Sequence, residues 1–244
     1  MAKFDLEEHL RREHKKNAFS EYLREIVYGG NDGIVTTFAV VAGFAGAQSS
    51  TDMMTVPLVS VLLFGLANLF ADGLSMSVGS FLSLRADQEV YANEKNKEAH
   101  EIHHDPENEY AETIEILSRK GFSTKDATTL AAILRKNHTY WTDFMMKDEL
   151  EMQNPEKENP FSIAVATFIS FTIFGAIPLL PYIFRMEGNI FPISLLCTGG
   201  ALILLGLLRS IVARQPWLRG ISETLLLGGL SAGVAYAVGS FFRI

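Results

Sequence analysis

Three long stretches of this sequence carry almost no charge, and they constrain the fold more than any other feature. Residues 161–184 and 188–208 contain no Asp, Glu, Lys or Arg, and residues 56–84 contain Asp72 alone. About 20 consecutive apolar residues are enough for a helix to cross the hydrocarbon core of a bilayer. The sequence therefore predicts an all-α, polytopic membrane protein.

Two further apolar segments complete the predicted membrane part. The five expected transmembrane helices cover residues 26–47, 56–84, 161–184, 188–208 and 220–242. Lys and Arg concentrate on the cytoplasmic side of membrane proteins. Here they cluster in residues 3–24 and 209–219 and are missing from residues 48–55. This bias places the N-terminus in the cytoplasm, and an odd number of spans places the C-terminus on the opposite side.

The net charge of the chain lies in one segment between the second and third spans. The whole chain has a formal charge of −7, and residues 85–159 contain 10 Lys/Arg against 17 Asp/Glu. That insert falls on the same side of the membrane as the N-terminus. We therefore expect four parts: a cytoplasmic N-terminal segment in 1–25, two spans in 26–84, a cytoplasmic acidic domain in 85–159, and three spans in 160–244.

The acidic insert has the pattern of three helices. No Gly or Pro occurs from Arg85 to His104, so the second span is expected to continue beyond the membrane as one helix. A second helix should run from Glu107 to Arg119 and stop before Gly121. Ser123 is a suitable N-cap for a third helix, which we expect to reach about Met152.

Composition excludes several classes of protein. The sequence has a pI of about 5.4 and no extended basic patch, so nucleic-acid binding is not expected. Cys197 is the single cysteine, which excludes an internal disulfide and a cysteine-rich metal site. The N-terminal segment is polar up to Arg24, so no cleavable signal peptide is expected.

Polar residues inside the predicted spans are candidates for a transport path, because each is costly in lipid. Asp32 follows two glycines in the first span. In the second span, Asn68, Asp72 and Met76 recur every fourth residue and share one helix face. A carboxylate beside a thioether suits a borderline cation such as Fe²⁺ better than Mg²⁺ or Ca²⁺. The alternative is that Asp72 pairs with a neighbouring helix and Met76 fills space.

The insert carries carboxylates at helical spacing. Glu98 with Glu101 and Glu109 with Glu112 are separated by three residues, so each pair lies on one helix face. Glu149 follows one turn after Met145, in the sequence Met145-Met146-Lys-Asp-Glu149. Three converging helices would form a carboxylate site for divalent ions, which should lose its ions as the pH approaches ~4. The alternative is that these acidic helix faces are simply exposed to solvent and bind no metal.

A competing motif lies in the same segment. His100-Glu101-Ile-His-His104 matches the H-E-x-x-H pattern of zinc proteases. Its flanks are charged, Asp105-Pro106 ends the helix at once, and no obvious third ligand follows. A membrane zinc metalloprotease is therefore the minor alternative, and the protein is expected not to be an enzyme.

Small residues at four-residue spacing occur in three spans. They let helix backbones approach closely in lipid, within one chain or between two copies. For the first span both explanations stay open, and for the fifth we favour packing within the chain. The residues concerned are Ala39, Gly43 and Ala47; Ala67, Ala71, Ser75, Gly79 and Ser83; and Gly229, Gly233 and Ala237.

Two separated motifs resemble the vacuolar iron transporter family. They are Tyr28-Gly-Gly-Asn-Asp-Gly-Ile-Val-Thr-Thr-Phe-Ala-Val-Val-Ala-Gly43 and Ala71-Asp-Gly-Leu-Ser-Met-Ser-Val-Gly-Ser-Phe-Leu82. The resemblance covers nearly the whole chain. It implies a homodimer with five spans and a cytoplasmic metal-binding domain, here residues 85–159.

The resemblance also implies which residues bind metal. In the cytoplasmic domain these are Glu98, Glu101, Glu109, Glu112, Met145, Met146 and Glu149, and in the membrane they are Asp32 and Met76. This chain departs from plant-type members at Asn68, where those have a glutamate, while Asp72 supplies a carboxylate one turn later. The residue that carries the proton is therefore open.

The expected function is proton-coupled export of cytosolic Fe²⁺, with Mn²⁺ and Zn²⁺ as further ions and no catalytic cofactor. A manganese-selective transporter has the same architecture and stays an alternative, as does a metal sensor or scaffold that the spans only anchor. The short N-terminal segment favours the cell membrane of a prokaryote over a vacuolar membrane.

Overall fold

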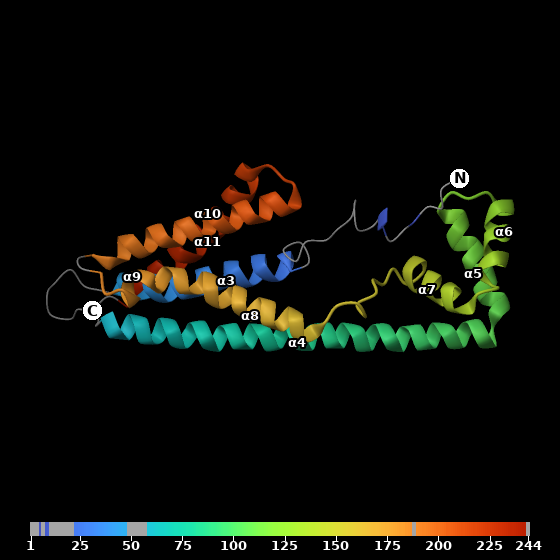
Figure 1. Ribbon diagram of the computed structural model, residues 1–244, viewed down its shortest axis with the longest axis horizontal. Coiled ribbons are helices and arrows are strands. Elements are labelled where there is room, and N and C mark those ends of the chain that lie inside the picture. Colours follow the sequence, from blue (N-terminus) through green and yellow to red (C-terminus); the bar gives the residue numbers. More distant parts are fainter. Residues whose placement is uncertain (1–4, 6–7, 10–21, 48–57, 187–188, 243–244) are drawn as a thin grey trace. The chain divides into compact units, whose positions relative to one another are not determined.

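The computed structural model describes residues 5, 8–9, 22–47, 58–186 and 189–242, and these form helices and no strand (Figure 1). The all-α prediction is confirmed for this part of the chain. Contacts within the chain divide it into two compact units. We call residues 1–80 with 161–244 the apolar unit and residues 81–160 the acidic unit. Most of the N-terminal basic segment and the loop 48–55 lie outside the described residues.

Helix α4 is the longest element and is continuous. It covers 47 residues (Figure 1), as the lack of Gly and Pro after Arg85 predicts. The helices are α3 (Leu23–Ala47), α4 (Leu58–His104), α5 (Pro106–Arg119), α6 (Thr124–Leu134), α7 (His138–Asp148), α8 (Pro160–Ala176), η1 (Ile177–Leu179, a 3₁₀ turn), α9 (Leu180–Ile183), α10 (Ile190–Ala213) and α11 (Trp217–Phe241).

Among the described residues, four helical segments are long and apolar enough to cross a membrane. They are α4, the run Pro160–Ile183 that contains α8 to α9, α10 and α11. Helix α3 is not one of them, because Asn31 and Asp32 lie within it and lower its mean hydropathy. Four of the five expected spans are thus supported by length and composition, and the first stays a prediction.

Helix α3 is nevertheless the centre of the apolar unit. Its residues Phe38 and Val41 belong to a buried cluster with Leu179 of η1. One turn earlier, Ile34 belongs to a second cluster with Leu202 and other residues of α10. Because neighbouring helices cover it, α3 tolerates polar residues that a lipid-facing helix would not.

Glycines bring α3 close to α8 at the level of Asp32. A Cβ atom at Gly29 would lie 3.0 Å from the carbonyl oxygen of Thr167, and one at Gly33 would overlap the carbonyl oxygen of Phe171. Ser170 of α8 also donates a hydrogen bond to the carbonyl of Ile26 in α3, at 2.8 Å. The glycines beside Asp32 therefore serve a close helix crossing.

The small-residue stripes do not share one role in the structure. Gly43 of α3 faces α11, where a side chain on Gly239 would overlap its carbonyl oxygen, so the first span uses this residue for packing within the chain. Gly229 and Gly233 have no heavy atom of the described chain within 4 Å of an added Cβ. The preference for internal packing of the fifth span was therefore wrong at these glycines. The stripe from Ala67 to Ser83 on α4 is exposed along its length.

Two expected helices are interrupted. The predicted helix from Ser123 to Met152 is split into α6 and α7, because the side chain of Asn137 accepts a hydrogen bond from the Tyr140 N–H and caps a new helix. The insert therefore has a fourth helical segment. The predicted span 161–184 is broken after Ala176, where Pro178 and Pro181 lack the N–H that an α-helix needs.

The α3–α8 crossing generates a stability prediction. Gly33→Ala places a methyl group against the carbonyl oxygen of Phe171, so the helices must separate. We expect a lower thermal unfolding midpoint in detergent, corresponding to about 1–3 kcal/mol. Gly200→Ala in α10 is the matched control, because an added Cβ atom at Gly200 meets no heavy atom of the described chain within 4 Å and Ala stabilises a helix interior relative to Gly. Equal midpoints for the two variants would contradict the importance of this crossing.

Candidate metal site

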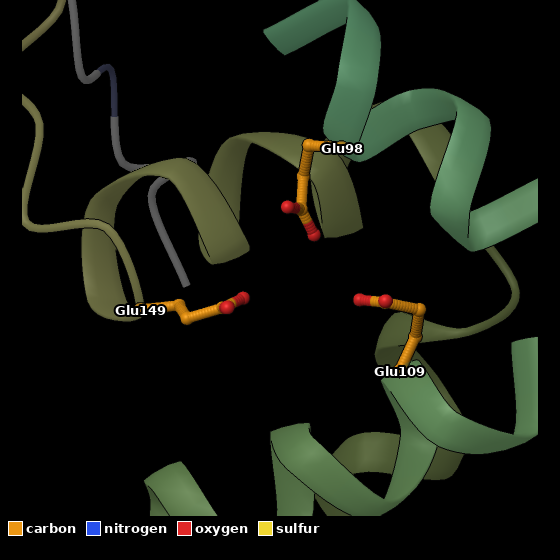
Figure 2. Close-up of side chains that lie close together, drawn as sticks. All are labelled: Glu98, Glu109 and Glu149. Carbon is orange, nitrogen blue, oxygen red and sulfur yellow. The ribbon is translucent and has the colours of Figure 1, made fainter. Parts of the chain in front are cut away.

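Three carboxylates converge in the acidic unit. Oxygen atoms of Glu98, Glu109 and Glu149 lie within 4.8 Å of one another. Figure 2 shows the three side chains pointing into a common space from α4, α5 and the end of α7. The turn from α4 to α5 is fixed by Asp105, whose carboxylate caps α5 by accepting from the Asn108 N–H at 3.3 Å. This reversal lets two carboxylates eleven positions apart face each other.

Two of the three carboxylates are buried without full hydrogen bonding. Glu98 is 3% exposed and Glu109 is 4% exposed. One oxygen of each, Oε1 of Glu98 and Oε2 of Glu109, has no hydrogen-bond partner. A buried carboxylate oxygen without a donor is unfavourable unless a proton or a cation satisfies it. The arrangement is therefore suited to binding a cation.

The same burial shifts the acidity of the site. Burial, together with the charges of Glu109 and Glu149, raises the pKa of Glu98 from 4.5 to about 8. Burial and the charges of neighbouring glutamates raise the pKa of Glu109 to about 7. Burial and the charges of Glu112 and Glu101 also raise the pKa of Glu149. Protons thus compete for these oxygens near neutral pH, and the loss of metal near pH 4 stays a prediction.

The remaining predicted ligands of the insert surround this group. Glu101 and Glu112 are half-buried and act on the three carboxylates through their charge. Met145 and Met146 are both fully buried, and Met145 packs in a core cluster with Ile102 and Trp141. The structure gives Met145 a packing role, and coordination by either sulfur stays a prediction.

A buried hydrogen-bonded group joins α5 to α7 beneath the carboxylates. The hydroxyl of Thr113 lies 2.8 Å from the carbonyl oxygen of Glu109 and 3.5 Å from the sulfur of Met145. It accepts a hydrogen bond of 2.7 Å from the indole N–H of Trp141. Sequence analysis missed this pair, although Thr113 lies one turn after Glu109 and Trp141 one turn before Met145. The hydrogen bond between Thr113 and Trp141 holds α5 and α7 together, and these helices position Glu109 and Glu149.

The apolar unit also brings polar residues of two helices together. Asp32 of α3 and Asp72 of α4 are close enough for their charges to interact. Both are half-buried, as are Asn68 and Met76. Sequence analysis missed Glu25, which is 5% exposed at the start of α3 and pairs with the guanidinium of Arg24 at 2.9 Å.

The H-E-x-x-H motif does not form a zinc-protease site. The rings of His100 and His104 stack with their centroids 3.7 Å apart. Nδ1 of His104 lies 2.9 Å from the carbonyl oxygen of His100. Glu101, which would be the catalytic base, instead acts electrostatically on Glu98.

The span-length helices and the carboxylate group together define a class, that of multi-span membrane proteins with an acidic unit that holds a group of converging carboxylates. Comparison with known proteins gives the family. The chain belongs to the VIT family, whose sequence pattern matches residues 23–240. This is a family of transporters rather than enzymes, so the protease alternative is set aside.

The relatives are similar over most of their length. A vacuolar iron transporter of Centaurea cyanus is 31% identical over 235 residues, which cover 95% of this chain and 93% of that protein. Vacuolar iron transporter 1 of Arabidopsis thaliana is 32% identical, covering 89% and 85% of the two chains. A vacuolar iron transporter of Toxoplasma gondii is 32% identical, covering 98% and 82%.

The joint between α5 and α7 can be tested directly. Thr113→Val removes the acceptor of the buried Trp141 N–H, which should lower the free energy of unfolding by about 1–3 kcal/mol and weaken Mn²⁺ binding. Thr113→Ser keeps the hydroxyl and should retain metal affinity. Unfolding is followed by Trp141 fluorescence in a Trp217→Phe background. If Val and Ser variants bind Mn²⁺ equally, Thr113 does not position the ligands.

The raised pKa values predict a pH-dependent stability without metal. Unfolded glutamates ionise near 4.5, whereas folded Glu109 and Glu98 ionise near 7 and 8. The unfolded chain therefore binds fewer protons between these values, and the stability of the acidic unit should fall as pH rises from about 5 to 8. We expect a loss of at least about 1.4 kcal/mol, the value of one pKa unit. In the double variant Glu98→Gln/Glu109→Gln, the free energy of unfolding measured in urea should no longer fall with pH. An unchanged dependence on pH would contradict the raised pKa values.

Proposed function

We propose that this protein exports Fe²⁺ from the cytosol in exchange for protons. The observation that carries the proposal is the group of Glu98, Glu109 and Glu149, two of them buried with an unpartnered oxygen, in a member of the VIT family. Relatives at about 30% identity are named as vacuolar iron transporters, which favours iron over manganese as the principal ion.

The acidic unit collects the ion. Its excess of carboxylates raises the local concentration of cations, and Glu98, Glu109 and Glu149 bind them. Glu101 and Glu112 add charge at the rim, and Met145 or Met146 supplies a softer ligand after a small rearrangement. Metal binding requires deprotonated ligands, so the raised pKa of Glu98 and Glu109 makes capture sensitive to pH near neutrality.

The apolar unit supplies the path across the membrane. Asp32 and Met76 bind the partly dehydrated ion, and Asp72, close to Asp32, carries the proton that Asn68 cannot. Protonation of a carboxylate from the acidic side of the membrane releases the metal. Coupling follows because proton and cation compete for the same oxygens.

Topology and assembly complete the proposal. The Lys/Arg bias places the N-terminus and the acidic unit in the cytoplasm, with α3 as the first of five spans. A homodimer is supported by the exposed stripe from Ala67 to Ser83 on α4, since close helix packing in lipid uses such residues. The membrane is the cell membrane in a prokaryote and the vacuolar membrane in a eukaryote.

Flux measurements in liposomes test the function. Purified protein should admit Fe²⁺, and Mn²⁺ more slowly, when the lumen is acidic, and flux should fall when the pH gradient is abolished. Asp32→Asn should reduce flux to the level of empty liposomes, because the path loses its central carboxylate. Asp72→Asn should change the pH dependence. Glu115→Gln is the control, since Glu115 is exposed and pairs with Arg119.

The outcomes separate the parts of the proposal. Iron flux that ignores the pH gradient would refute exchange while leaving transport intact. Wild-type flux through Asp32→Asn would remove that residue from the path. Glu98→Gln/Glu109→Gln/Glu149→Gln should slow flux chiefly at low Fe²⁺, and unchanged flux there would show that the acidic unit does not collect the ion.

A further inference from the structure

Four of the six histidines of the chain lie where α4 ends and α7 begins. His100, His103 and His104 are in the last turns of α4, and His138 is the first residue of α7. All four are exposed. None belongs to the carboxylate group of Glu98, Glu109 and Glu149, and the proposed transport cycle uses none of them.

His103 and His138 meet across the two helices. Their ring centroids are 5.2 Å apart, and the ring planes are inclined by 77°. Two imidazoles bound through nitrogen to one tetrahedral Zn²⁺ at about 2.0–2.1 Å have ring centres roughly 5 Å apart. The separation of His103 and His138 is therefore the one that a shared ion requires.

The H-E-x-x-H histidines provide a contrast within the same segment. The rings of His100 and His104 are 3.7 Å apart and within 12° of parallel. Stacked rings at this distance must separate before both can bind one ion. One ring nitrogen of His104 is in addition close to the carbonyl oxygen of His100. The spacing in the sequence suggests His100 and His104 as metal ligands. The folded geometry instead favours His103 and His138.

The surroundings of His138 help to hold its ring. Its centroid is 6.3 Å from the ring of Trp141, one turn further along α7, and Trp141 is itself anchored to Thr113. The ring of His138 therefore lies beside a side chain that is buried and hydrogen-bonded. Exposure of both histidines leaves room for water to fill the remaining coordination positions of an ion.

We propose that His103 and His138 form a second metal site, which binds divalent ions that prefer nitrogen ligands. Imidazole suits Zn²⁺, Ni²⁺ and Cu²⁺, whereas Mn²⁺ prefers the oxygen ligands of the carboxylate group. An ion at this site links α4 to α7, the helices that hold Glu98 and Glu149. The inference does not rest on iron transport.

Copper spectroscopy on the full-length protein in detergent tests the site. The background carries Glu98→Gln, Glu109→Gln and Glu149→Gln, together with His9→Gln and His14→Gln, so that the carboxylate group and the N-terminal histidines do not contribute. We expect about one tightly held Cu²⁺ per chain whose electron paramagnetic resonance shows coupling to two imidazole nitrogens. Mn²⁺ should not displace it.

Two histidine variants in this background decide the assignment. His103→Gln/His138→Gln should abolish the coupling to nitrogen, and each single replacement should leave coupling to one nitrogen. His100→Gln/His104→Gln is the matched control and should keep both. Coupling that survives in His103→Gln/His138→Gln, or that disappears only in His100→Gln/His104→Gln, would overturn the proposal. The four histidines replaced in these variants are exposed, and far-ultraviolet circular dichroism verifies that each variant is folded.

Discussion

The carboxylates of Glu98, Glu109 and Glu149 repel one another, and the helices of the acidic unit hold them together against that repulsion. The capped turn before α5, the hydrogen bonds of Thr113 and the packing of Ile102, Trp141 and Met145 supply the opposing stabilisation. Burial, together with the charges of neighbouring glutamates, raises the pKa values of these carboxyl groups, so that Glu98 and Glu109 retain protons near neutral pH when no cation is bound. The proposed capture of a metal ion and the stability of this unit would thus depend on the same repulsion between carboxylates.

The apolar unit solves a related problem in another way. A carboxylate within a membrane needs polar neighbours and must be shielded from the lipid by other helices. Helix α3 obtains both, because its neighbours bury it and because the glycines beside Asp32 allow α8 to approach closely. Asp72 of α4 then lies within electrostatic reach of Asp32. The polar residues Asn31 and Asp32 lower the mean hydropathy of α3. The same residues make this helix suitable for lining an ion path.

Sequence patterns predicted features that depend on a single helix, and they failed where neighbouring segments decide. Uncharged runs identified the four described helical segments that are long and apolar enough to span a membrane, and the absence of Gly and Pro predicted the continuity of α4. The break at Asn137 was missed, because a local cap overcame a helical pattern. Spacing placed Glu98 beside Glu101, but only the crossing of three helices joins Glu98 to Glu109 and Glu149. For the same reason Thr113, Trp141 and the contact of His103 with His138 could not be read from the sequence.

The pKa values of Glu98 and Glu109, about 8 and about 7, have an electrical consequence. Near neutral pH the empty site retains protons, and a divalent ion that enters must displace them. Under the proposed function the site would exchange a divalent ion for protons, and its charge would change by less than the two units that the metal brings. Loading would then change the electrostatic potential that the next cation meets by less than it would if all three carboxylates were ionised in the empty site.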